Sequence, residues 1–413
     1  MNEDKKRLLS NFFSLSVLQG LNMILPLITL PYLVRVLGVE NFGLVNFSLA
    51  IIMYFNILVS FGFELSATRE VSMNRDNIER LSEIFFSVMI IKSIMALISI
   101  SILTILIFSI DMFLEHAMLY YVTFGIVIGN VVFPSWFFQG MERMKYITYI
   151  NLVSKVAFTV LIFVLVKNTD DYIYVPLLNS LGVIFGGLYS LLLIFKLFNV
   201  KITIPSKQVI IAQLKDSYHF FLSRIANNGS RYFATTIIGL YFGNVVVGYY
   251  SIVEKLFYAF MSLGGIVSQT IYPYMSRTKN IVFFKKIFAL VIGVSIIILI
   301  PTIYLNEFLL LSIFNIQNEM LSNIFIIVFS GSIFGIASAL VGYPLLAAFG
   351  YIKEANNSLI YASFIYIIFI VISAIFLENM YFVSASLLIY ELVGLLLRIY
   401  YIKRKKIFTQ EGV

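Results

Sequence analysis

The sequence predicts an all-α integral membrane protein with about twelve transmembrane helices. Hydrophobic residues make up 60% of the 413 residues, charged residues make up only 12%, and the mean hydropathy is +0.95. Apolar runs of roughly 20 residues, the length of a helix that crosses a bilayer, recur along the whole chain. Backbone polar groups must be paired within lipid, and these runs lack the short alternation of barrel strands. Helices are therefore predicted rather than a barrel.

Twelve apolar runs define the predicted spans. The first is too long for the hydrophobic segment of a cleavable signal peptide and has no small-residue cleavage site, so we expect it to be retained as a span. In chain order the runs are residues 10–34, 43–66, 83–108, 117–138, 148–166, 173–195, 217–241, 246–273, 284–304, 321–346, 357–377 and 380–401.

The lysines and arginines predict how these spans are oriented. With the N-terminus inside, 22 of the 29 cations lie in the tails and inner loops, whereas the outer loops hold only Arg35 and Lys167. The positive-inside rule then places both termini in the cytoplasm. The same residues account for the net charge of +8, so the basic composition points to membrane anchoring and not to nucleic acid.

An internal repeat predicts how the spans are grouped. The segment from Gly38 to Gly43 has the same glycine spacing as the segment 205 residues later, 243–248. Pro134 with Gly140 likewise matches Pro344 with Gly350, at an offset of 210. We therefore expect two six-helix bundles, residues 1–197 and 215–413, joined by a cytoplasmic linker at 198–214. Six spans separate equivalent helices, so the halves form a parallel repeat about an axis along the membrane normal, with a central cleft.

Two arginines mark the candidate binding site. Arg224 and Arg231 lie inside an otherwise transmembrane run, and a helix places residues seven apart on one face, about 10 Å from each other. A guanidinium at membrane depth costs several kcal/mol unless it faces water, a counter-charge or a ligand, so this face is expected to line a cavity for an anion. The alternative is that the arginines brace helices. The other residues assigned to the polar wall are Asn227, Asn228, Gln19 and Asn22.

Further charged residues in the spans allow two interpretations each. Lys255 and Glu254 are either a structural ion pair, for example between Glu254 and Arg231, or a substrate contact and charge relay. Glu391 is the best isolated acid for coupling to protons or cations, unless it pairs with Arg398 two turns away.

Residues nearer the predicted span ends are also ambiguous. Arg35 either gates the exit or caps a helix C-terminus through the helix dipole. Lys92 and Lys155 either reach the membrane surface with their long side chains or line the cavity. Pro26 and Pro134 favour bending, as hinges or merely as two of the prolines common in membrane helices.

Two segments carry a family resemblance. They contain NFFSL at Asn11–Leu15, LPL at Leu25–Leu27, PYLVRVLG at Pro31–Gly38 and FPSWFFQGMERMKYIT at Phe133–Thr148. This pattern resembles Wzx-type polysaccharide flippases, which form one group with multidrug antiporters and peptidoglycan-precursor flippases. The motif similarity lies mainly in the first 150 residues, whereas length and span number fit the whole chain.

The resemblance implies a function and partners. It implies export of an undecaprenyl-diphosphate-linked oligosaccharide, for O-antigen or capsule, from the inner to the outer leaflet of the bacterial cytoplasmic membrane. It also implies that the protein works together with a polysaccharide polymerase and chain-length machinery. The residues agree with such a substrate, because arginine binds phosphate oxygens in bidentate fashion and amide side chains suit sugar hydroxyls.

Enzyme signatures are missing from the sequence. It has no cysteine, Gly-rich phosphate loop or nucleophile elbow, and its two histidines are too far apart in sequence for one metal site. We therefore expect no catalytic residue, metal or cofactor. Two alternatives remain: an ion-coupled multidrug or organic-cation antiporter, which needs acids in its cavity, and a polysaccharide polymerase or ligase, which needs a large outer loop. The sequence leaves open whether membrane potential, protons or sodium drive transport.

Overall fold

The structure is a computed structural model that describes the backbone of residues 3–225 and 229–409. Side chains are described for residue 20 and for residues 23–222, 224–225 and 229–408. By contacts the chain divides into two compact units, residues 1–232 and 233–413, with the division inside helix α10 (Ser230–Phe242). The bundle boundaries predicted from the repeat, 1–197 and 215–413, stay a prediction.

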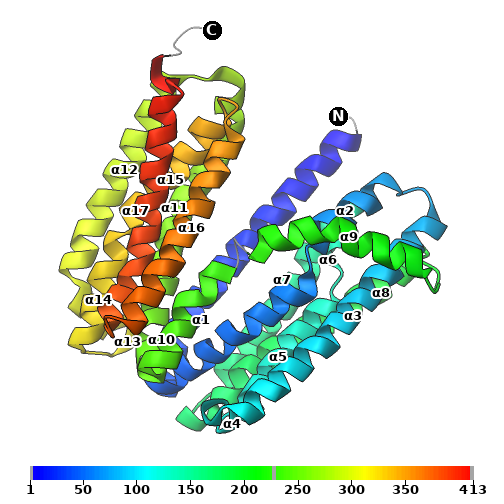
Figure 1. The fold of residues 1–413 in the computed structure, drawn as a ribbon, viewed down its shortest axis with the longest axis horizontal. Helices are drawn as coiled ribbons and strands as arrows, with labels where there is room; N and C mark the ends of the chain where they lie inside the picture. The colour runs from blue at the N-terminus through cyan, green and yellow to red at the C-terminus, as the bar shows by residue number, and fades with distance from the viewer. Residues whose placement is uncertain (1–2, 226–228, 410–413) are drawn as a thin grey trace. The chain divides into compact units, whose positions relative to one another are not determined.

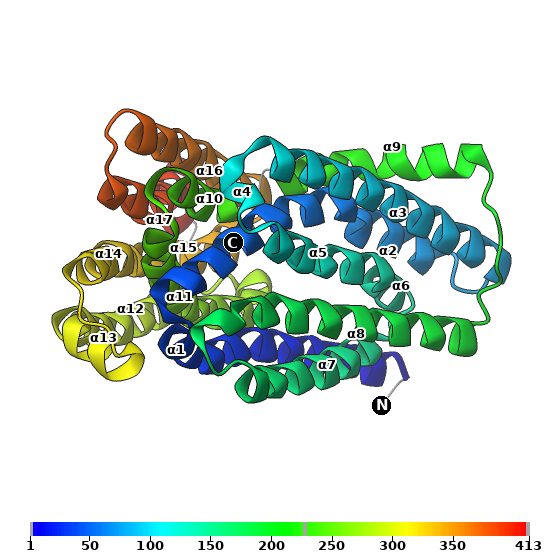
Figure 2. The ribbon, with the colours of Figure 1, turned by 90° about the horizontal axis from the view of Figure 1, so that it is seen from below.

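The first unit is built from helices and short helical turns. Residues 207–214 of the predicted linker begin α9, which packs along α2 and α3 (Figure 2). In order the elements are α1 (Glu3–Ser60), α2 (Phe63–Met73), α3 (Ile78–Ser109), α4 (Asp111–Leu114), α5 (Ala117–Val132), α6 (Ser135–Gly140), α7 (Met144–Leu165), η1 (Thr169–Ile173), α8 (Tyr174–Phe198) and α9 (Lys207–Arg224).

The second unit is a bundle of long helices in which α17 contacts α14, α15 and α16 (Figure 1). Its elements are α11 (Asn244–Thr278), α12 (Ile281–Tyr304), α13 (Asn306–Phe314), α14 (Glu319–Ser330), α15 (Ser332–Val341), η3 (Gly342–Ala347), α16 (Ile352–Ile375), α17 (Met380–Arg404) and η4 (Ile407–Thr409).

The helices confirm the predicted fold class. Among the described residues, ten stretches are long and apolar enough to cross a membrane. The first of them, Met23–Met73, contains more than one span because the backbone leaves helical geometry at Gly38. The protein is therefore an all-α, multi-pass membrane protein with about twelve spans.

Both units use the same local construction. Gly38 has φ 74° and ψ 167°, and Gly243 has φ 84° and ψ 174°. This backbone region is essentially restricted to glycine. The packing pairs also correspond, because α5 and α7 pack on α8 in the first unit as α15 and α16 pack on α17 in the second. The glycine pairing inferred from the sequence thus coincides with a shared backbone break.

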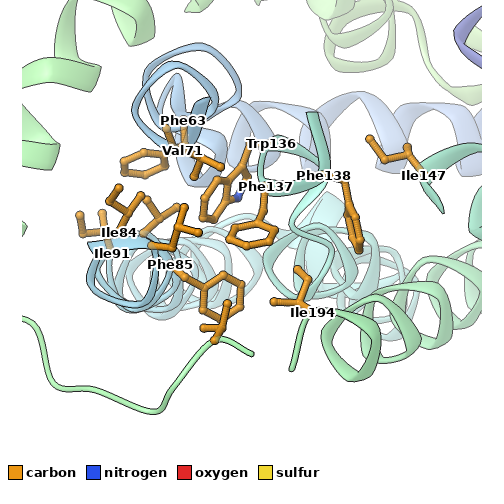
Figure 3. Close-up of a cluster of buried hydrophobic side chains, with 14 residues drawn as sticks. Phe63, Val71, Ile84, Phe85, Ile91, Trp136, Phe137, Phe138, Ile147 and Ile194 are labelled. Atoms are coloured by element: carbon orange, nitrogen blue, oxygen red, sulfur yellow. The ribbon is translucent and has the colours of Figure 1, made fainter. Parts of the chain in front are cut away.

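The family motif at 133–148 forms the core of the first unit. Trp136, Phe137 and Phe138 are fully buried, and Figure 3 shows Trp136 and Phe137 beside Phe63 of α2 and Phe85 of α3. These aromatic rings are buried against neighbouring side chains, and edge-to-face contacts between the rings fix their orientation. The motif therefore holds α2, α3 and α6 together.

Close backbone approach at Gly140 gives a stability prediction. A Cβ there would lie 2.6 Å from Val71 Cβ and 2.9 Å from the Thr68 carbonyl oxygen. We expect Gly140→Ala to destabilise the protein by about 1–3 kcal/mol, because backbone atoms cannot move aside cheaply. Thermal unfolding in detergent measures this effect. The control is Gly293→Ala in α12, where a Cβ meets nothing within 4 Å. Equal unfolding temperatures for Gly140→Ala and the wild type would contradict the prediction.

Candidate functional site

Arg224 is held by a carboxylate from its own unit. Its Nη2 lies 2.6 Å from Oε2 of Glu64, and both side chains are partly exposed, at 33% and 42%. Glu64 lies in the first turn of α2, whereas Arg224 is the last residue of α9. One of the two predicted anion ligands therefore has a partner that sequence reasoning did not find.

A break between α1 and α2 positions this pair. Phe61 (φ 40°) and Gly62 (φ 78°) are both left-handed, so the chain changes direction just before Glu64. A Cβ on Gly62 would lie 2.8 Å from both Phe220 Cβ and Phe221 N, and the Phe61 and Phe221 rings stack at 4.6 Å. Glycine is required here both for its conformation and for the close approach of α9. This packing brings the end of α9 to the start of α2.

Lys92 lies inside the first unit. Its side chain is 5% exposed, and Nζ donates a 2.5 Å hydrogen bond to the backbone oxygen of Asn130. In a regular helix that oxygen would accept from the amide four residues later, but residue 134 is proline and has no N–H. The lysine satisfies an acceptor that Pro134 leaves open at the end of α5. For Lys92, the expectation that the side chain reaches the membrane surface is therefore wrong.

Two further polar contacts complete this cluster. The Asn130 side chain donates to Oδ1 of Asn56 at 2.9 Å, which ties α5 to α1. The Glu64 carboxylate attracts the Lys92 ammonium. Glu64 therefore interacts with two cations, Arg224 by direct contact and Lys92 electrostatically. We define Glu64, Lys92, Arg224 and Asn130 as the charge cluster.

The second unit has a comparable buried cation. Arg398 of α17 donates from Nη1 to the backbone oxygen of Ser338 at 2.5 Å and to its hydroxyl at 2.9 Å. It also donates from Nε to Ser358 Oγ at 3.0 Å and from Nη2 to the Ala355 oxygen at 3.4 Å. The guanidinium thus joins α15, α16 and α17 at the end of α15. The Ser338 oxygen also accepts a hydrogen bond from the Gly342 N–H, so this buried cation reinforces the end of α15 and does not replace a missing backbone donor.

Glu391 lies buried near Arg398. Its side chain is 8% exposed, and a Cβ on Gly335 would lie 2.9 Å from its carboxyl carbon. The hydrogen bonds of Arg398 in the described part of the chain go to α15 and α16, so the two charges attract each other without direct contact. The pairing considered from sequence is electrostatic and not a hydrogen-bonded ion pair. Glu391 remains a candidate for coupling.

The structure places the remaining predicted site residues as follows. Arg231, at the start of α10, is exposed. Asn227 and Asn228 lie outside the described residues, as do the side chains of Gln19 and Asn22. Glu254 and Lys255 are both on α11 of the second unit and partly buried, and Glu254 is near the buried Tyr250.

Two of the predicted gating residues lie on α1 before the break at Gly38, and a third lies between α5 and α6. Pro26 is inside the first arm of α1, and Arg35 is exposed near the end of that arm. Pro134 is the N-cap of α6, in the gap between α5 and α6. Pro134 is connected to the charge cluster through the Asn130 carbonyl oxygen, to which Lys92 donates. The sequence signal that could have predicted this contact is the spacing of Asn130 and Pro134. A proline four residues later leaves the Asn130 carbonyl without a helical donor, and Lys92 in another span can supply one.

Comparisons with known proteins agree with the membrane architecture. Residues 8–279 match a family described as "Polysaccharide biosynthesis protein". The chain is 30% identical over 293 residues to a protein of Escherichia coli (strain K12) named "Putative O-antigen transporter", covering 69% of this chain and 70% of that protein. A protein of the same name from Shigella dysenteriae is 26% identical over 331 residues, covering 77% of this chain and 81% of that protein.

Solved structures share the fold. The lipid II flippase MurJ in an inward closed conformation aligns with a TM-score of 0.71 and 14% identity, covering 97% of this chain and 89% of that chain. An inward-facing multidrug resistance MATE family transporter aligns with a TM-score of 0.64 and 13% identity, covering 97% of this chain and all of that chain. At such identities the likeness shows the fold alone. The family match covers more than half of the chain and confirms the resemblance to Wzx-type flippases, so this protein belongs to the polysaccharide biosynthesis protein family.

Proposed function

We propose that this protein is a flippase that carries a lipid-linked oligosaccharide across the membrane during biosynthesis of a cell-surface polysaccharide. The observation that carries the proposal is the family match over residues 8–279, together with relatives described as O-antigen transporters. The fold alone does not select the substrate, because a lipid II flippase and a multidrug transporter share it.

The proposed substrate is an undecaprenyl-diphosphate-linked repeat unit. Its diphosphate and sugar hydroxyls cannot cross hydrocarbon unaided, whereas its prenyl tail can stay in lipid. Arg224 and Arg231 are the proposed diphosphate ligands, because a guanidinium binds phosphate oxygens through two parallel charge-assisted hydrogen bonds. The proposed polar wall comprises Asn227, Asn228, Gln19 and Asn22, and Lys255 is a further proposed substrate contact.

The proposed cycle is alternating access in the bacterial cytoplasmic membrane with both termini inside. The diphosphate head enters sideways from the inner leaflet, the inner side closes, and the outer side opens. Glu254, Arg35, Pro26 and Pro134 are the proposed gating residues, and Glu391 is the proposed site for any ion coupling. A polymerase and chain-length proteins would then use the exported unit.

A reconstitution assay tests this proposal. A fluorescent short-chain prenyl-diphosphate disaccharide is placed in the inner leaflet of proteoliposomes, and its arrival outside is measured with a membrane-impermeant quencher. We expect the purified protein to raise the rate of arrival at least tenfold over protein-free liposomes. Ethidium provides the control for an antiporter. Transport of ethidium without transport of the lipid-linked sugar would contradict the proposal.

A further inference from the structure

One carboxylate in the first unit serves two cations that belong to different helices. Glu64 of α2 contacts Arg224 of α9 at 2.6 Å and attracts Lys92 of α3. The pair with Arg224 is partly exposed, so another anion can reach the guanidinium and compete with the carboxylate. Lys92 is buried and cannot be reached from outside the unit in the same way.

Lys92 links the Glu64 carboxylate to the gap between α5 and α6, where Pro134 interrupts the predicted span 117–138. Its Nζ donates a hydrogen bond to the Asn130 carbonyl oxygen. That oxygen lacks a backbone donor within the helix because residue 134 is proline. If Lys92 turns toward Glu64, that carbonyl loses its hydrogen-bond donor, and a buried acceptor without a donor destabilises the structure around it. The connection between α5 and α6 is then held less firmly.

We propose that Glu64 occupies the place of the substrate's diphosphate on Arg224 in the unloaded protein, and that Lys92 transmits its displacement to the Pro134 break. When a diphosphate binds Arg224 and displaces the Glu64 carboxylate, Glu64 still attracts Lys92. Lys92 then shifts from Asn130 toward Glu64, and the α5–α6 connection becomes free to bend. In this scheme Glu64 competes with the substrate, and Lys92 is a positioning residue. The inference rests on the proposed role of Arg224 as a diphosphate ligand.

A diphosphate is the anion that suits this exchange. It carries more negative charge than a carboxylate and offers oxygens on two phosphorus atoms, so it binds a guanidinium more strongly than Glu64 does. The Arg224–Glu64 pair is partly exposed, so the net stabilisation that it provides is small. Glu64 thus keeps Arg224 positioned without preventing substrate from binding.

The test is a binding titration with farnesyl diphosphate on the purified protein in nanodiscs. We expect Glu64→Gln to lower the Kd about two- to fivefold, because the competing carboxylate is gone. Glu64→Asp should give a smaller decrease. The matched control is Glu142→Gln, which breaks a pair with Arg75 of similar length, 2.7 Å, and similar exposure. It should leave the Kd unchanged. A Kd for Glu64→Gln equal to or higher than that of the wild type overturns the exchange.

A second measurement addresses Lys92. The chain has no cysteine, so spin labels at Ile128→Cys on α5 and Tyr149→Cys on α7 report the distance across the Pro134 break. We expect farnesyl diphosphate to shift this distance distribution in the otherwise native protein. With farnesyl diphosphate at a concentration that saturates each variant, the shift should vanish with Lys92→Gln and return with Lys92→Arg. A shift that persists with Lys92→Gln excludes Lys92 as the link.

The variant Arg224→Gln separates this inference from the proposed function. If Arg224→Gln binds farnesyl diphosphate as the wild type does, the ligand assignment fails and the exchange fails with it. If Arg224→Gln loses binding but Glu64→Gln gains none, only the exchange is wrong. Inorganic pyrophosphate, titrated in parallel, separates recognition of the diphosphate from binding of the prenyl tail.

Discussion

Replacing Arg224 or Arg231 with alanine is expected to reduce export of the surface polymer at least tenfold. A hydrogen bond to a charged group contributes about 1.5–3 kcal/mol, and each arginine is proposed to make two such bonds to the diphosphate. Lysine at either position should restore export only in part, because an ammonium is a point charge without the planar fork. Surface polymer is measured in a strain that lacks its own flippase.

Membrane abundance separates loss of function from loss of protein. Immunoblots of the membrane fraction should show equal amounts of the wild type and both alanine variants, because Arg224 is partly exposed and Arg231 is exposed. The exposed Arg404→Ala, in the last turn of α17, is the control for removing a cation and should export normally. Normal export by both Arg224→Ala and Arg231→Ala would place the diphosphate site elsewhere in the protein.

The second large effect is expected from membrane potential. Outward movement of an anion from a negative interior is favoured by about 2.3 kcal/mol per charge per 100 mV, so a dianionic head gains roughly 4–5 kcal/mol. Reconstituted transport of the lipid-linked sugar should therefore accelerate when the receiving side is made positive, without a proton or sodium gradient. A potassium gradient with valinomycin sets the potential in the proteoliposome assay.

The same assay distinguishes the flippase from a cation antiporter. Glu391→Gln and Glu254→Gln neutralise acids, whereas Arg224→Gln and Arg231→Gln neutralise cations. A flippase driven by potential should lose activity with the arginine variants. Loss confined to the acid variants, together with a requirement for an ion gradient, would favour the antiporter.

The sequence alone predicted features that depend on local composition and spacing. Apolar runs of sufficient length predicted the spans, because burial in lipid requires a helix of about 20 residues wherever it occurs. The glycine pairing predicted a repeat, and Gly38 and Gly243 indeed share a conformation that other residues rarely adopt. The motif around Trp136 indicated the family, and its aromatic residues form the buried core of the first unit.

Only the tertiary structure decided which charges meet. Lys92 is 38 residues from Asn130, and Glu64 is 160 residues from Arg224. These contacts depend on how α2, α3, α5 and α9 pack, which no periodicity within one helix encodes. The position of Lys92 in its span allowed either an outward or an inward side chain. The inward position follows from the carbonyl that Pro134 leaves without a donor, which Lys92 reaches because α3 and α5 lie side by side.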